Sequence, residues 1–336
     1  MKEFGLTLEQ TRIMFSYQYH LVLADIDNES SFATKGFKRK WLSLWKDSTE
    51  IFLKSQAAQN PTIKSDLQLL TDFPILKDLI NEIKDEAGNK LTLCLILLET
   101  TLFKPYYSLG NSTNDDNLKN LKIFNEELLV NKLKFFARTL DIDSSVVIRF
   151  KSHYDEAIQG IKGGWNPLLI GAIGAIVLAV VAAFFTPAIA ALLAPILAPG
   201  LSGAAAVSAV LAALGGGAIA AGGFGMAGGF AVIIAGGAIL GAGAGAGVGA
   251  VFAQSPDSAL TQAAKLEVVM KEIVLIQKDI RLAQEIIKEQ RQAIRSLEDQ
   301  KDDLLLNKEK NKQKIENLEK AIEYLKNALK RNQDLL

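Results

Sequence analysis

The chain reads GGWNPLLIGAIGAIVLAVVAAFFTPAIA over residues 163–190, and this composition continues to residue 256. No charged residue occurs in the 94 consecutive positions between Lys162 and Asp257, which are mainly Ala, Gly, Leu, Ile and Val. A helix of roughly 20 apolar residues spans the hydrocarbon core of a bilayer. A water-exposed domain needs more polar surface than this segment supplies. The segment therefore predicts insertion into a membrane, with length for several crossings.

Two parts of the uncharged segment have the length of a spanning helix. The first is Pro167–Thr186 and the second is Phe230–Phe252, while a shorter apolar piece at 201–214 leaves two or three spans open. Trp165 precedes the first part, where an interfacial aromatic side chain would hold the helix end at the membrane surface. We expect these residues to enter the membrane: Trp165, Pro167, Phe184, Phe185, Phe230 and Phe252.

Glycines recur every four residues in the second part, at Gly237, Gly241, Gly245 and Gly249. In a helix this spacing places them on one stripe, which lets another backbone approach closely. We favour close helix packing over the alternative that these glycines only make an apolar backbone flexible.

A heptad pattern runs through the C-terminal part, from Leu266 to Leu336, without Gly or Pro. Its apolar positions predict a coiled-coil seam that includes Ile273, Ile280, Ile287, Ile294, Ile315, Ile322 and Leu329. One unbroken helix of this length would be about 105 Å long. Lys301, Lys308 and Asn311 interrupt the apolar seam, so they set register, mark a bend or allow a hairpin. The seam needs a partner, which is a second subunit or the N-terminal domain.

Residues 1–162 predict a soluble helical domain, which divides the chain into 1–162, 163–256 and 257–336. Thr7 and Gln10 form a capping box before the first helix. The pattern predicts further helices from about Ser31 into the 50s, up to residue 86 with a kink or split at Pro74, and over 90–107, 117–140 and 144–160. No run of short alternating strands occurs, so the fold class is all-α.

An aromatic stripe lies beside a basic stretch in the second predicted helix. Phe37, Trp41, Trp45 and Phe52 recur near helical spacing, next to several lysines and Arg39. Such a helix lies on a membrane surface, or it buries the aromatic stripe in a core and exposes the basic face. The balanced charge of this domain favours the second interpretation.

Composition excludes several functional classes. The chain carries 37 basic and 37 acidic residues, nearly balanced in each charged flank, which is not the basic face of a nucleic-acid-binding protein. His20 and His153 lack further ligands at metal spacing, and no phosphate-binding loop or catalytic set occurs. We therefore expect no enzyme activity, metal, cofactor or small-molecule substrate. The start, MKEFGLTLEQ, lacks the apolar core of a secretory signal.

The order of these parts resembles the α-helical pore-forming toxins of the cytolysin A and tripartite-haemolysin type. In those proteins a hydrophobic head lies between long helices and enters the bilayer on assembly. The resemblance implies that Pro167–Thr186 and Phe230–Phe252 form the inserting head and that Leu266–Leu336 form the stalk. From the uncharged segment and the heptad seam we also expect a lipid bilayer as a partner and homo- or hetero-oligomers through the coiled coil.

Two other functions fit the same parts. In the first, the chain is a constitutive membrane anchor that presents a coiled coil to a partner. In the second, it is an intracellular defence effector that damages its host's own membrane. A soluble form that converts to a membrane-bound one would have to cover the uncharged segment, since a large exposed apolar patch causes aggregation. All three functions place the protein at a membrane.

Overall fold

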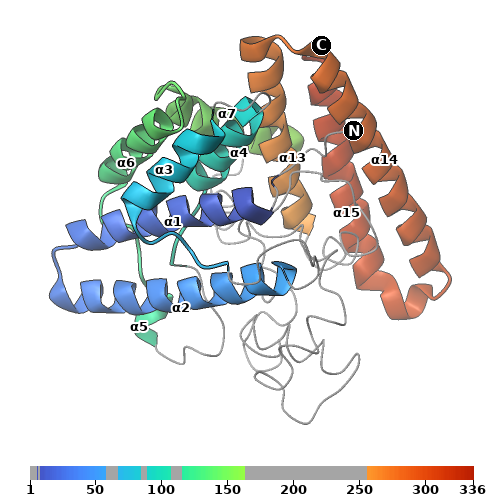
Figure 1. The fold of residues 1–336 in the computed structure, drawn as a ribbon. Coiled ribbons are helices and arrows are strands. Elements are labelled where there is room, and N and C mark those ends of the chain that lie inside the picture. Colours follow the sequence, from blue (N-terminus) through green and yellow to red (C-terminus); the bar gives the residue numbers. More distant parts are fainter. Residues whose placement is uncertain (1–5, 7, 58–66, 85–88, 107–115, 163–255) are drawn as a thin grey trace. The chain divides into compact units, whose positions relative to one another are not determined.

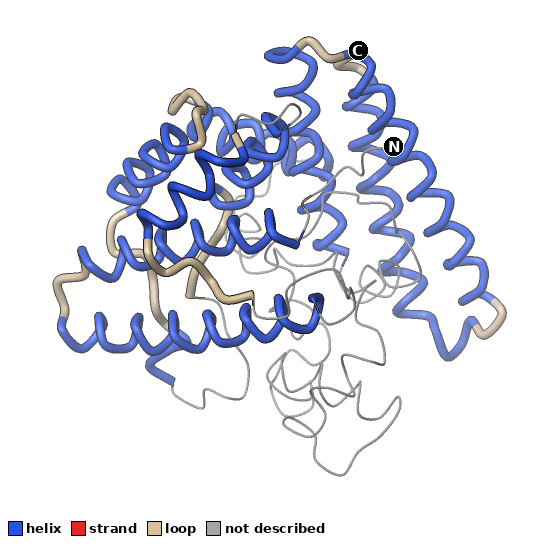
Figure 2. Tube along the Cα trace, in the orientation of Figure 1, coloured by secondary structure: helices blue, strands red, loops and turns tan. Residues whose placement is uncertain are grey.

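A computed structural model describes the two charged flanks of the chain, and these flanks are helical without a strand (Figures 1 and 2). The described residues are 6, 8–57, 67–84, 89–106, 116–162 and 256–336. They confirm the all-α class for these parts. They form two compact units: an N-terminal unit, residues 6–149, and a C-terminal unit, residues 150–162 with 256–336.

Helix α1 (Leu8–Asn28) is the central element of the N-terminal unit. It packs against α2 (Phe32–Ala57), α4 (Asn89–Thr101) and α6 (Glu126–Thr139), and Figure 1 shows α1 and α2 running side by side. The burial of large apolar side chains on several sides of α1 explains this position. Those side chains are Ile13, Met14, Phe15, Tyr17, Leu21, Val22 and Ile26.

The aromatic stripe of α2 belongs to the core of this unit. Trp41 and Trp45 are buried and stack with ring centroids 6.2 Å apart, and Phe15 of α1 meets Trp45 edge-on. This confirms the core interpretation for the two tryptophans. The neighbouring Lys38 is also fully buried, so the expectation of a solvated basic face was wrong for this residue.

Two predicted helices of this unit have different bounds. Helix α3 (Phe73–Ile83) has Pro74 in its first turn, and Asp72 caps the helix by accepting a hydrogen bond from the Ile75 amide. Pro74 therefore lies at the start of a helix and does not kink a longer one. The helix predicted over 117–140 is divided into α5 (Asp116–Lys119) and α6. Asn125 caps α6 by accepting hydrogen bonds from the amides of its first turn.

The C-terminal unit contains the end of α7 (Val146–Lys162) and the four helical segments that follow residue 255. These are α13 (Pro256–Lys271), the π-helix η3 (Glu272–Gln277), α14 (Ile280–Leu305) and α15 (Lys308–Gln333). Helix α15 packs along both α13 and α14. Figure 1 shows α13 and α15 running in one direction and α14 in the other.

The C-terminal heptad region therefore forms several helices in place of the single long helix that its pattern predicted. The first break is at Lys278, which has a left-handed backbone with φ of 56°, and at Asp279, which caps α14. The second lies at Leu306 and Asn307. Near it Asn311 donates its side-chain amide to the Leu304 carbonyl at 3.3 Å, which supports the hairpin among the three roles considered for the polar positions.

Candidate functional site

The two ends of the uncharged segment attach to the same unit. Helix α7 ends at Lys162 and α13 begins at Pro256, and both ends belong to the C-terminal unit. Because the segment leaves and re-enters one unit, the contacts that join α7, α13 and α15 are the first candidate site. We call the four charged residues at these contacts, Glu156, Glu267, Lys271 and Arg331, the clasp.

Arg331 of α15 and Glu267 of α13 form the centre of the clasp. The guanidinium donates through Nε to Oε2 and through Nη2 to Oε1, each at 2.6 Å, which is a bidentate pair. The Glu267 side chain is 2% exposed and that of Arg331 is 35% exposed. A carboxylate so deeply buried depends on its partner cation for compensation of its lost hydration.

Lys271 connects this pair to α7. Its ammonium lies 3.4 Å from Glu267 Oε1 and 3.1 Å from Oε2 of Glu156. The hydrogen bond from Lys271 lowers the pKa of Glu156 below its usual value. The hydrogen bonds to Glu267 raise the pKa of Arg331. Two cations and two carboxylates therefore balance one another across three helices.

The end of α7 is also held through its backbone. Asn327 donates its side-chain amide to the Ile161 carbonyl at 3.0 Å, which satisfies one of the carbonyls left open at a helix end. Gly160 lies where a Cβ atom would overlap the guanidinium of Arg331. The absence of a side chain at Gly160 therefore lets Arg331 lie against α7.

These contacts fix the direction of the helices. Glu156 lies beside Lys271, whereas Gly160 lies beside Arg331, which binds Glu267 four residues earlier in α13. Helix α7 therefore runs antiparallel to α13. Because α7 leads into the uncharged segment and α13 leads out of it, both connections point toward the same end of the unit.

The predicted seam lies largely between α14 and α15 of one chain. Ile287 and Ile294 of α14 and Ile315 and Ile322 of α15 are buried, and Leu329 is half-buried. Gln290 and Asn332 form a buried polar contact in the same interface, with Asn332 Nδ2 donating to Gln290 Oε1 at 3.2 Å. The hairpin thus covers this part of the seam without a second subunit.

The other two seam residues lie at the first break. Ile273 of η3 is buried, and Ile280, the first residue of α14, is 43% exposed. The left-handed backbone of Lys278 ends the preceding helix, so the apolar stripe changes direction at this break. A coiled coil between subunits stays a prediction.

The predicted membrane-inserting residues and the glycine stripe lie outside the described residues. The former are Trp165, Pro167, Phe184, Phe185, Phe230 and Phe252, and the latter are Gly237, Gly241, Gly245 and Gly249. Among the helices that the structure describes, none combines the length and the apolar character that a membrane span requires.

A second polar cluster is buried in the N-terminal unit, and sequence reasoning missed it. Lys38 of α2 lies 2.6 Å from Asp25 Oδ2 and 3.0 Å from Glu29 Oε2. Tyr106 donates its hydroxyl to the same Asp25 oxygen, and the Lys38 ammonium lies 5.1 Å from its ring centroid. The other Asp25 oxygen accepts from the Phe124 amide at 2.8 Å. Burial, together with these carboxylates, raises the pKa of Tyr106.

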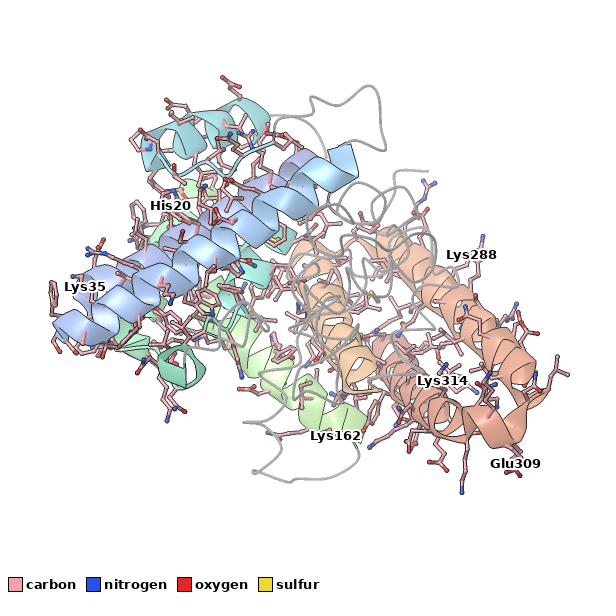
Figure 3. All side chains as sticks on the ribbon, turned by 90° about the horizontal axis from the view of Figure 1, so that it is seen from below. His20, Lys35, Lys162, Lys288, Glu309 and Lys314 are labelled. Carbon is pink, nitrogen blue, oxygen red and sulfur yellow. The ribbon has the colours of Figure 1, made fainter. Side chains whose placement is uncertain are left out.

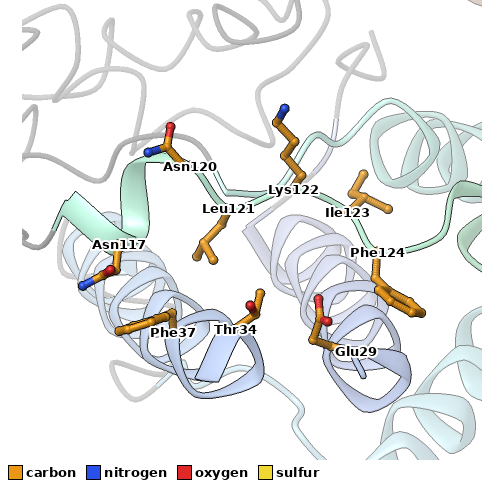
Figure 4. A pocket seen from close by; sticks show the side chains of 9 residues that line it. All are labelled: Glu29, Thr34, Phe37, Asn117, Asn120, Leu121, Lys122, Ile123 and Phe124. Carbon is orange, nitrogen blue, oxygen red and sulfur yellow. The ribbon is translucent and has the colours of Figure 1, made fainter. Parts of the chain in front are cut away.

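A cavity of about 620 Å³ borders this cluster through Glu29 (Figure 4). Its lining is mixed, with the carboxylate of Glu29, asparagine amides and apolar side chains such as Leu121 and Phe37. In the parts of the chain that the structure describes, no group of three or more His, Cys, Asp or Glu side chains is arranged to hold a metal ion. The cluster is a structural tie between α1, α2 and the segments that precede α5 and α6.

Comparison with protein-family models, with curated proteins and with solved structures finds no match for this chain.

Proposed function

We propose that the protein permeabilises membranes by inserting apolar helices from residues 163–256 into a lipid bilayer. The observation that carries the proposal is the run of 94 uncharged positions, whose two ends attach to one helical unit. Such a run is stable in hydrocarbon if its backbone is helical, because every backbone polar group then has a partner within the segment.

Through the clasp, the C-terminal unit would hold the two ends of the inserting segment together. The clasp ties α7 and α13 to α15, so that the two ends of the segment stay together while the segment changes its surroundings. Insertion as a hairpin requires its ends on one side of the membrane. The antiparallel direction of α7 and α13 supports such an entry.

The proposal includes oligomers in the membrane. Two apolar helices from one chain do not enclose a water-filled path, so permeation requires several copies or a partner subunit. The glycine stripe at Gly237, Gly241, Gly245 and Gly249 supplies a close-packing surface between inserted helices. Before insertion, helices of the flanks would cover the segment, and the conversion would be a switch between two packings.

Release of a dye from lipid vesicles tests the proposal. We expect the detergent-free full chain to release the dye. We expect Val180→Arg to lower the initial rate at least about tenfold, because a charge well inside a spanning helix costs up to about 2.5–3.5 kcal/mol. The matched control is Ile148→Arg, which adds the same charge at an exposed position of α7. It should release dye like the unaltered protein.

A constitutive anchor also fits the attachment of both segment ends to one unit. The same experiment separates this function from permeabilisation. A protein that floats with the vesicles and leaves the dye enclosed at every protein-to-lipid ratio does not permeabilise them. Equal release by Val180→Arg and the unaltered protein would also contradict insertion of this part of the segment.

A further inference from the structure

We propose that the turn between α14 and α15 binds the surface of anionic lipid bilayers. We define the hairpin tip as Leu305, Leu306, Lys308, Lys310, Lys312 and Lys314. Leu305 is 41% exposed and Leu306 is 82% exposed, which places two large apolar side chains at the end of a polar hairpin. Apolar side chains beside a cationic helix are the combination that lies in a membrane interface.

The four lysines of the hairpin tip are exposed, and none forms an ion pair with a residue that the structure describes. Figure 3 labels Glu309 and Lys314 near this end of α15. Residues 302–314 carry three acidic residues, Asp302, Asp303 and Glu309, against these four lysines, while Lys301 pairs with Glu319. The tip region therefore remains net positive, which complements an anionic lipid surface.

The lysines are also at the end of α15 that disfavours them. The first turns of a helix carry the positive end of the helix dipole, so acidic side chains stabilise this end and lysines oppose it. Lys308 and Lys310 lie in the first turn of α15 and Lys312 and Lys314 follow in the second. Phosphate groups of lipids would reverse this unfavourable arrangement by placing negative charge next to the tip.

The direction of the helices places the hairpin tip on the side where the segment must meet a bilayer. Arg331 lies opposite Glu267, and α13 and α15 run the same way, so Pro256 lies opposite about residue 320. Helix α15 begins at Lys308 and thus extends about 18 Å beyond the start of α13. Both connections of the uncharged segment point toward this end. This orientation argument rests on the proposed function, whereas binding by the tip does not.

Flotation of the full chain with vesicles tests the hairpin tip. One set of vesicles contains phosphatidylcholine with phosphatidylserine, and the other contains phosphatidylcholine alone. We expect binding to the anionic set that weakens with added salt. Reversing two charges with Lys310→Glu and Lys314→Glu should lower the binding constant at least about tenfold. Leu306→Ser should lower it several-fold, because an exposed apolar side chain no longer enters the interface.

The matched control is Lys288→Glu with Lys330→Glu, which reverses two exposed charges on the same two helices away from the tip. This control should bind the anionic vesicles much more tightly than the tip variant. Equal binding by the two double variants, or equal binding of the unaltered protein to both vesicle sets, would overturn the proposal. Circular dichroism of each variant checks that the helices are retained.

Dye release in the same vesicles separates this proposal from the proposed function. Val180→Arg, which we expect to impair insertion, should still float with anionic vesicles if the tip binds them. Tip-dependent binding without any release by the unaltered protein would reject permeabilisation and keep the hairpin tip as a lipid-binding surface. Release that is equal for the tip variant and the unaltered protein at limiting protein would reject the tip as the docking surface and keep permeabilisation.

Discussion

Arg331 binds Glu267 through two nitrogens, with both donor–acceptor distances at 2.6 Å, and this pair joins α15 to α13. The residues are 64 positions apart in the chain, and the carboxylate is almost completely buried. Because α13 begins at Pro256, the pair holds against α15 the helix that follows the uncharged segment. The stability of this unit should therefore depend on Arg331 more than on an ordinary surface arginine.

Arg331→Ala should lower the free energy of unfolding by about 2 kcal/mol, because it leaves the buried Glu267 carboxylate without its main partner. The estimate is below that for a fully buried pair because the guanidinium is partly exposed. Urea unfolding of the full chain, followed by circular dichroism, measures the change. The matched control is Lys326→Ala, which removes an exposed ion pair with Glu298 and should change stability by less than about 1 kcal/mol. Equal effects would contradict the importance of the clasp.

Gly160→Ala and Gly36→Ala test the space that Arg331 occupies on α7. Both glycines lie in helices, where alanine alone would stabilise by about 0.5–1 kcal/mol. We expect this gain at Gly36, where a Cβ atom meets nothing within 4 Å. At Gly160 the Cβ atom would displace the guanidinium, so the gain should be absent or reversed. The urea midpoints of the two variants measure the difference, and a similar gain at both positions would show that Arg331 moves away freely.

Local signals predicted most helices of the described parts. The capping box at Thr7 and the apolar spacing that follows predicted a helix close to α1, and the pattern from Ser31 predicted α2, because both signals lie within a few residues of the helix they specify. A distant contact holds the segment between α5 and α6. Asp25 accepts the Phe124 amide across 99 positions, and no local pattern indicates such a pairing.

The clasp could be predicted only in part. Glu267 and Lys271 are four residues apart on a helix, which is a recognisable local pair. Arg331 and Glu156 come from other helices, and in the sequence they are ordinary surface charges. Gly160 gave no separate signal, because it ends the helix predicted over 144–160, where glycine is a common terminator. The hairpin turn was one of three outcomes that the polar positions left open.

Ile287→Asp and Ile280→Asp test whether the heptad seam is used within the chain. A carboxylate at the buried Ile287 should cost at least about 3 kcal/mol of hairpin stability. Ile280 is exposed at the first turn of α14, where an acidic residue is tolerated, so its substitution should cost less than about 1 kcal/mol. Urea unfolding measures both. Sedimentation of Ile280→Asp should match that of the unaltered protein, and a loss of oligomers at unchanged stability would place the seam between subunits.

The last prediction concerns His20, whose ring lies 5.1 Å from that of Phe73 and whose Nε2 lies 2.9 Å from the Leu70 carbonyl. Burial is the largest cause that lowers the pKa of His20 from 6.5, and the nearby Lys132 ammonium adds to it, while Leu70 and Asp72 oppose it. The unfolded chain therefore takes up a proton on this ring at a higher pH than the folded chain does. Stability should be full above pH 6.5, fall as the pH drops below it, and level off below the folded pKa.

Comparison of the full chain with His20→Gln checks this pH dependence. The urea midpoint of the unaltered protein should fall between pH 7.5 and pH 5.5, and the fall should be smaller in His20→Gln because the variant has no proton to take up at this position. Glutamine also retains a side-chain amide that can reach toward the Leu70 carbonyl. A fall of equal size in both proteins would show that other groups cause it and that His20 is protonated equally in the folded and unfolded states.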